Sequence, residues 1–169
     1  MKTSRTAAAV TLAATLALST LSTAAASSPW LHHGTAWTNS RAVEPRVTGL
    51  RYAAHTGFDR AVIDVDGRRP SYQTGYAKRC HYDASGKTVP IKGKRALWIA
   101  LAPATAHDAG GSTYDGPDLA RPHLSALRAL AFTGDVESQV SFCFALNTTG
   151  SYRILRLSDP SRIVIDFQH

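Results

Sequence analysis

The sequence has few acidic residues, no long charged run and no sustained helical period, and the last two absences each exclude a class of protein. Asp and Glu number 12 against 19 Lys and Arg, which gives a formal net charge of +7. The basic residues are scattered rather than clustered, so the sequence offers no case for a nucleic-acid-binding protein. After the N-terminus no segment keeps a helical period for roughly twelve residues, and this excludes parallel α/β folds, which need crossover helices.

The longest apolar stretch lies at the N-terminus. Lys2 and Arg5 precede an apolar run over residues 7–21, and small residues follow it over 22–28. This three-part organisation is typical of a secretory signal peptide. A membrane anchor is the alternative, but the run has about fifteen residues and a membrane span needs roughly twenty. We expect residues 1–26 to be a signal peptide and the mature chain to be secreted, extracellular or wall-associated, with no membrane span.

The rest of the chain divides at about residue 45. Residues 27–45 contain two Trp and two adjacent His but follow neither a helical nor an alternating pattern, so we expect a flexible N-terminal arm. Residues 46–169 are enough for one domain that buries about two-thirds of the surface of its unfolded chain.

The stretch GFDRAVIDVDG, residues 57–67, is the clearest strand in the chain. Ala61, Ile63 and Val65 fall on one face, and charged residues dominate the other. This alternation is typical of a half-buried strand. Asp66 and Gly67 then form a turn signal that leads to another extended segment.

Further strands follow from the same alternation. They are expected near residues 47–52, 72–76, 96–102, 140–146, 152–157 and 163–167. Residues 123–130 are compatible with one or two helical turns or with the approach to a strand. The short strands and regular turn signals predict an all-β fold, an antiparallel β-sandwich or closed roll of about eight short strands with at most one short helix.

The chain contains two cysteines, Cys80 and Cys143, which allow one intramolecular pairing. Oxidation is permitted outside the cytoplasm. Cys143 lies on the strand face opposite to Phe142 and Phe144, which argues against a thiol buried in the core. A disulfide is favoured, although the sequence does not place Cys80 within the roughly 7 Å Cα separation that bonding requires.

The longest irregular connection covers residues 104–122, and within it the Gly and Asp residues of the loop 106–117 have little apolar surface to bury. We expect it at the rim of the sandwich. There Tyr114 would present a ring, and Asp108 and Asp115 would accept hydrogen bonds from sugar hydroxyls. A self-bonded Ω-like loop is the alternative.

Catalytic and metal-binding interpretations of the same loop are weaker. Ser112 is near His107 and Asp108 in sequence, but no GxSxG elbow surrounds it. His107, Asp108 and Asp115 include metal-ligand types, yet carboxylates beside glycines more often stabilise turns. We therefore expect neither an enzyme nor a metal or cofactor site.

Three separated motifs carry a resemblance to a known family. GFDRAVIDVDG, AHDAGGSTYDGP and LSDPSRIVIDF, in that order and spacing, resemble the AMIN-like domain of exported actinobacterial proteins over roughly residues 46–169. That family is similar to the AMIN domain, a β-sandwich that targets wall amidases and secretin-type proteins to the envelope by binding peptidoglycan. The resemblance implies a non-catalytic envelope module.

Together these observations predict a secreted module, most simply a monomer, that binds peptidoglycan or another wall polysaccharide. The candidate ligand-binding residues are Tyr114, Asp108, Asp115, His107, Trp98 and Tyr72. A scaffold that holds an envelope protein at a sheet edge or at the long loop is the alternative, followed by a small hydrolase. Asp59 and Arg60, at the entrance of the clearest strand, are expected to serve structure rather than binding.

Overall fold

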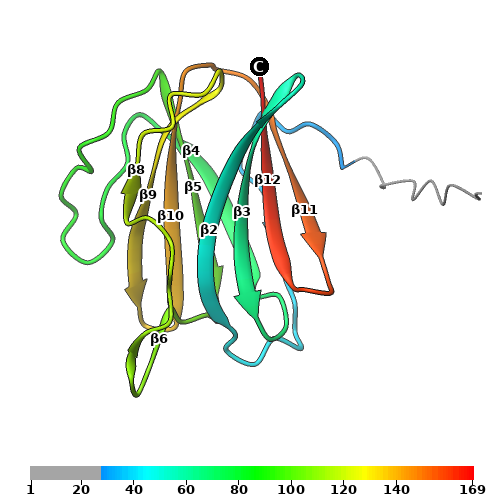
Figure 1. Cartoon of the computed structure of the whole chain (residues 1–169), viewed down its shortest axis with the longest axis vertical. Coiled ribbons are helices and arrows are strands. Elements are labelled where there is room, and N and C mark those ends of the chain that lie inside the picture. The colour runs from blue at the N-terminus through cyan, green and yellow to red at the C-terminus, as the bar shows by residue number, and fades with distance from the viewer. Residues whose placement is uncertain (1–27) are drawn as a thin grey trace, which may run out of the picture.

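The computed structural model describes residues 28–169, which fold into two antiparallel β-sheets packed face to face (Figure 1). One sheet has the order β1-β4-β5-β10-β9-β8, the other β11-β12-β3-β2, and β6-β7 forms a separate ribbon. The strands are β1 Ala36–Trp37, β2 Arg46–His55, β3 Phe58–Asp66, β4 Ser71–Ala77, β5 Arg95–Ala102, β6 His107–Asp108, β7 Gly111–Ser112, β8 Leu119–Ala120, β9 Leu127–Val136, β10 Gln139–Leu146, β11 Tyr152–Leu157 and β12 Arg162–Gln168.

The predicted all-β sandwich is therefore confirmed, and the closed roll is not formed. Eight of the strands have six or more residues, in agreement with the eight short strands expected. The described residues contain no helix, and of residues 123–130 the last four already belong to β9, which begins at Leu127. No helix among residues 28–169 is long and apolar enough to cross a membrane.

The hairpin of β2 and β3 follows from the alternation read in the sequence. Ala61, Ile63 and Val65 are buried, while the side chains between them lie on the outer face. Gly57 makes the turn with φ +83°, in the left-handed region that favours glycine. The turn after β3 does not form a second hairpin, because β4 belongs to the other sheet.

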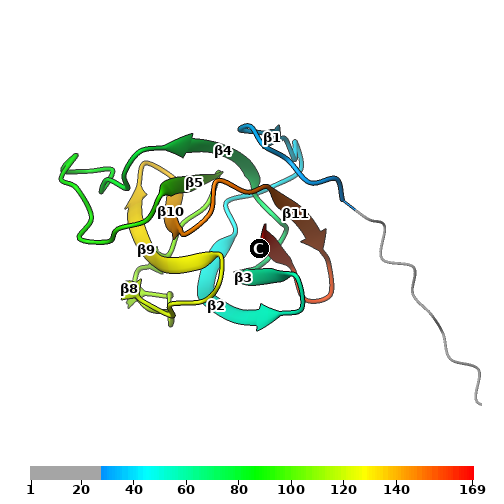
Figure 2. The ribbon, with the colours of Figure 1, turned by 90° about the horizontal axis from the view of Figure 1, so that it is seen from above.

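The core lies between the two sheets (Figure 2). Ile99 of β5 and Phe142 of β10 contribute from the six-stranded sheet, and Ile63 of β3 and Ile165 of β12 from the four-stranded sheet, all with no exposed surface. Each fully buried side chain of this size stabilises the fold by roughly 1.5–3 kcal/mol. The inward positions of β10 and β12 are those that the alternation predicted.

A second apolar cluster lies on the outer face of the six-stranded sheet, under the loop that joins β4 to β5. Figures 1 and 2 show this loop projecting from one side of the sandwich. Val89 and Ile91 of the loop are buried in a cluster with Ala129, Ala131 and Ala145 of the sheet. The sheet positions that contact Val89 and Ile91 hold alanines, and this leaves room for the loop to pack.

The disulfide predicted between Cys80 and Cys143 is present, with a Cα separation of 5.7 Å. Cys143 faces outward from β10, as its alternation with Phe142 and Phe144 required. The bond fixes the start of the loop to the middle of the sheet.

The segment expected as a flexible arm lies against the sandwich instead, as far as the structure describes it. Leu31 exchanges two backbone hydrogen bonds with Tyr152, and β1 pairs with β4 at Trp37 and Tyr72. An irregular sequence pattern does not reveal this docking, because the pairing partners are far away in the chain. The predicted signal peptide, residues 1–26, lies outside the described residues.

Candidate functional site

The loop of residues 106–117 forms a compact hairpin followed by an inward turn. His107 and Asp108 of β6 pair with Ser112 and Gly111 of β7, and this ribbon stands at the lower end of the sandwich in Figure 1. Asp108 accepts a hydrogen bond from the Gly110 backbone N–H at 2.8 Å, so its carboxylate stabilises the turn.

Tyr114 turns toward the core rather than presenting its ring at the rim. The ring stacks on Phe132 with centroids 4.8 Å apart, and its hydroxyl donates a hydrogen bond to the Pro117 carbonyl at 3.0 Å. Burial raises the pKa of the Tyr114 hydroxyl well above its ordinary value, and the negative charge of Asp118 adds to the shift. The exposed Asp115 donates its backbone N–H to the Thr48 carbonyl. These contacts fit the self-bonded loop better than a sugar platform.

His107 forms an exposed ion pair outside this turn. Its Nδ1 lies 2.5 Å from Asp135 Oδ2, and the side chain is 60% exposed. The hydrogen bond to Asp135 raises the pKa of the imidazole, and the charge of the same carboxylate adds to the shift. The pair ties the ribbon to the end of β9.

The residues considered for hydrolysis do not form a catalytic array. Ser112 and His107 are cross-strand neighbours, but the Ser112 hydroxyl hydrogen-bonds the Tyr114 backbone and His107 bonds Asp135. Nucleophile and base therefore have different partners, whereas a triad requires them to bond each other. Within residues 28–169 no group of three or more His, Cys, Asp or Glu side chains is placed to hold a metal ion.

The two other predicted aromatic residues differ in exposure. Tyr72, a candidate ligand-binding residue, is only 6% exposed and belongs to the core, so its ring does not lie at the surface. It faces inward on β4, where Trp37 and Arg156 also contact it. Trp98 faces outward on β5 and is partly exposed.

Trp98 forms part of an open cavity of about 460 Å³ beside the disulfide. We call it the Trp98 cavity. Its lining combines the indole with polar side chains, among them Gln73, His81, Asp83, Gln139 and Ser141. The indole lies against Gly75, where an added Cβ would come within 2.6 Å of the ring. Glycine at this position therefore allows the ring to lie close to the sheet.

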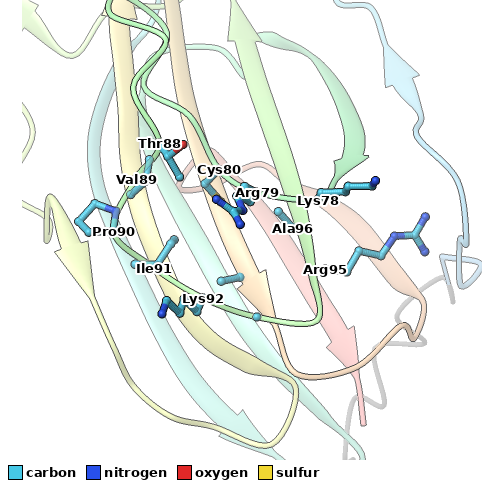
Figure 3. A pocket seen from close by; sticks show the side chains of 12 residues that line it. Lys78, Arg79, Cys80, Thr88, Val89, Pro90, Ile91, Lys92, Arg95 and Ala96 are labelled. Carbon is cyan, nitrogen blue, oxygen red and sulfur yellow. The ribbon is translucent and has the colours of Figure 1, made fainter.

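A second open cavity, of about 650 Å³, also has Cys80 in its lining (Figure 3). We call it the basic cavity because its lining holds four cationic side chains and no acidic one; the four are Lys78, Arg79, Lys92 and Arg95. In Figure 3 Lys78 and Arg95 lie at one end, Lys92 at the other and Arg79 between them. Arg79 and Cys80 line both cavities.

The sequence contained a signal for the basic cavity that strand patterns do not capture. Residues 84–106 contain no Asp or Glu but several Lys and Arg. In the linear sequence such a segment does not indicate a binding site. In the folded protein Lys92 and Arg95 of this segment line the same cavity as Lys78 and Arg79.

A family model described as AMIN-like domain matches residues 45–169, which is most of the chain. No curated protein matches the sequence, and no solved structure does. The family match and the disulfide are consistent with an extracellular or envelope location.

Proposed function

Since this chain belongs to the AMIN-like domain family, whose members are typically non-catalytic modules associated with the cell envelope, we propose that it binds peptidoglycan or another wall polysaccharide. The binding surface is the Trp98 cavity. The protein acts there without catalysis, as a secreted or wall-associated monomer that needs no cofactor.

One observation carries this proposal: an outward-facing Trp is surrounded by amide, carboxylate and hydroxyl side chains in one open hollow. Sugars present apolar C–H faces and polar hydroxyl edges. An indole offers a broad apolar face for stacking, and groups such as Gln73, Asp83 and Gln139 offer both donors and acceptors for hydroxyls. The same chemistry was predicted for the loop of Tyr114, but there the ring is engaged by Phe132.

The disulfide gives this surface a fixed geometry. Cys80 lines the Trp98 cavity and is bonded to Cys143 of β10, which also lines it. A preformed surface loses less conformational entropy when it binds, so more of the contact energy appears as affinity.

Retention on insoluble peptidoglycan tests the proposal. Wild-type mature protein should sediment with peptidoglycan, and Trp98→Ala should leave most of the protein in the supernatant. Tyr52→Ala is the matched control, because Tyr52 is an exposed aromatic residue on β2, in the other sheet. Equal retention of wild type and Trp98→Ala, or no sedimentation of the wild type, would contradict the proposal.

A protein-interaction scaffold is the second candidate, and the edge of β2 favours it. β2 is the last strand of its sheet, and residues 51–55 are all exposed. An extended segment of an envelope protein could add to such an edge. Crosslinking in cells distinguishes the two functions, since a recurrent protein adduct at β2 supports the scaffold and wall fragments alone support the polysaccharide binder.

A further inference from the structure

The charges of the molecule are distributed unevenly around the loop between β4 and β5. The basic cavity holds Lys78, Arg79, Lys92 and Arg95 with no acidic side chain in its lining. Lys92 also borders a smaller hollow with Arg121, His123 and Arg128. The cations therefore continue beyond one cavity along this side of the protein.

These cations are not neutralised by neighbouring carboxylates in the described part of the chain. The ion pairs there involve other basic residues: Arg46, Arg51, Arg60, Arg153, His107 and His169. Arg95 has a different contact, because its guanidinium lies 3.4 Å from the centroid of the Tyr76 ring. Stacking of this kind orders the side chain but leaves its charge uncompensated.

The walls of the cavity are held in place from both ends of the loop. Cys80 is bonded to Cys143, and the Lys94 backbone N–H donates to the Leu146 carbonyl at 2.7 Å. Gly93 approaches the Leu146 backbone so closely that a Cβ would lie 2.6 Å from its carbonyl oxygen. The backbone that lines the cavity is thus fixed, and an anion bound there would have cationic side chains around it.

We infer that the basic cavity binds the anionic groups, phosphate or carboxylate, of a cell-wall polymer. The inference rests on the proposed function, since it adds a charged part to the wall ligand that the Trp98 cavity holds. Arg79 and Cys80 line both cavities, so one chain can cross from the aromatic surface to the cationic one. The row of cations beyond Lys92 fits repeated charges on a polymer better than a single small anion.

The test compares two double variants with equal loss of charge. Lys78→Gln/Lys92→Gln removes two exposed cations of the cavity, and Arg41→Gln/Arg68→Gln removes two exposed cations elsewhere. The probes are poly(glycerol phosphate), polygalacturonate and neutral dextran, and the readout is the Kd at low salt. Wild type should bind an anionic polymer but not dextran. If two exposed charge contacts contribute about 0.7 kcal/mol each, the cavity variant should bind about tenfold more weakly and the control less than twofold.

The two anionic probes identify the source of the charge, because preference for one indicates a phosphodiester or a uronate polymer. Absence of binding to both, or equal weakening in the two double variants, would overturn the inference. An equally tight, variant-sensitive complex with a single-stranded DNA oligonucleotide would also overturn it, since the cavity would then bind polyanions of another class.

Retention on peptidoglycan stripped of its charged polymers keeps the two proposals apart. Lys78→Gln/Lys92→Gln should sediment with this material like the wild type, because the Trp98 cavity is intact. Normal sedimentation without affinity for the charged probes rejects only the anionic site. If the wild type binds poly(glycerol phosphate) but does not sediment with the stripped peptidoglycan, only the proposal that the Trp98 cavity binds neutral glycan is rejected.

Discussion

His169, the last residue of the chain, is hydrogen-bonded to Asp59 at the start of β3, with Nε2 3.0 Å from Oδ1. The other carboxylate oxygen accepts the backbone N–H groups of Ala126 and Leu127 at 2.6 and 2.8 Å. Asp59 is completely buried, and it joins the four-stranded sheet to the start of β9 in the six-stranded sheet. This carboxylate accepts hydrogen bonds from two backbone N–H groups at the point where β9 begins.

Asp59→Ala should therefore destabilise the protein strongly. Two buried N–H groups would lose their acceptor, at roughly 1–3 kcal/mol each, so we expect the free energy of unfolding to fall by about 3 kcal/mol. Chemical denaturation measures the change. Asp64→Ala is the control. Its carboxylate pairs with Arg51, which is 62% exposed, so the substitution should cost less than about 1 kcal/mol. Equal losses would refute a special role for Asp59.

Tyr114→Ala should change stability without changing glycan retention. The substitution removes a ring that packs on Phe132 and Phe142, and truncation of a large aromatic side chain in such a site costs about 3 kcal/mol. Tyr114→Phe keeps the ring and loses only the hydrogen bond to Pro117, at about 1 kcal/mol. Thermal melts and peptidoglycan sedimentation per folded molecule measure the two effects. A drop in retention at unchanged Tm would restore Tyr114 as a binding residue.

Gly75→Ala should displace the Trp98 ring and so change the shape of the Trp98 cavity. The new methyl group would lie 2.6 Å from Trp98 Cζ2, so the indole must move. Strain of this kind typically costs about 1–3 kcal/mol, and we expect glycan retention to fall with it. Gly110→Ala adds a methyl 3.2 Å from Asp108 Oδ1, away from Trp98, and should leave retention unchanged. Normal retention of Gly75→Ala would show that the indole position is not needed.

The ion pair of His107 and Asp135 should give a titration that depends on the carboxylate. The pKa of His107 is raised because Asp135 hydrogen-bonds its imidazole. The folded state holds the proton more tightly than the unfolded chain. The stabilisation is therefore complete below the ordinary histidine pKa of about 6.5 and disappears as the pH rises through the raised value. NMR titration should show this raised pKa in wild type and its return toward the ordinary value in Asp135→Asn. An unchanged pKa in the variant would contradict the assignment.

Local alternation of apolar and polar residues was sufficient to predict several of the strands. In β3, β5, β10 and β12 the apolar residues at alternate positions, such as Ile63, Ile99, Phe142 and Ile165, are those that lie in the core between the sheets. The same alternation placed Cys143 outside the core, where its bond to Cys80 is found. Because these inferences need only neighbouring residues, they required no knowledge of the fold.

The contacts between these elements could be seen only in the folded structure. Folding brought β4 into the sheet opposite β3, turned Tyr114 onto Phe132, buried Tyr72 in the core and docked Leu31 on Tyr152. It also packed the β4–β5 loop on the outer face of the sheet, where Cys80 lines both the Trp98 cavity and the basic cavity. Each of these contacts joins residues far apart in the chain, and their free energy depends on surfaces that exist only after the sheets have packed.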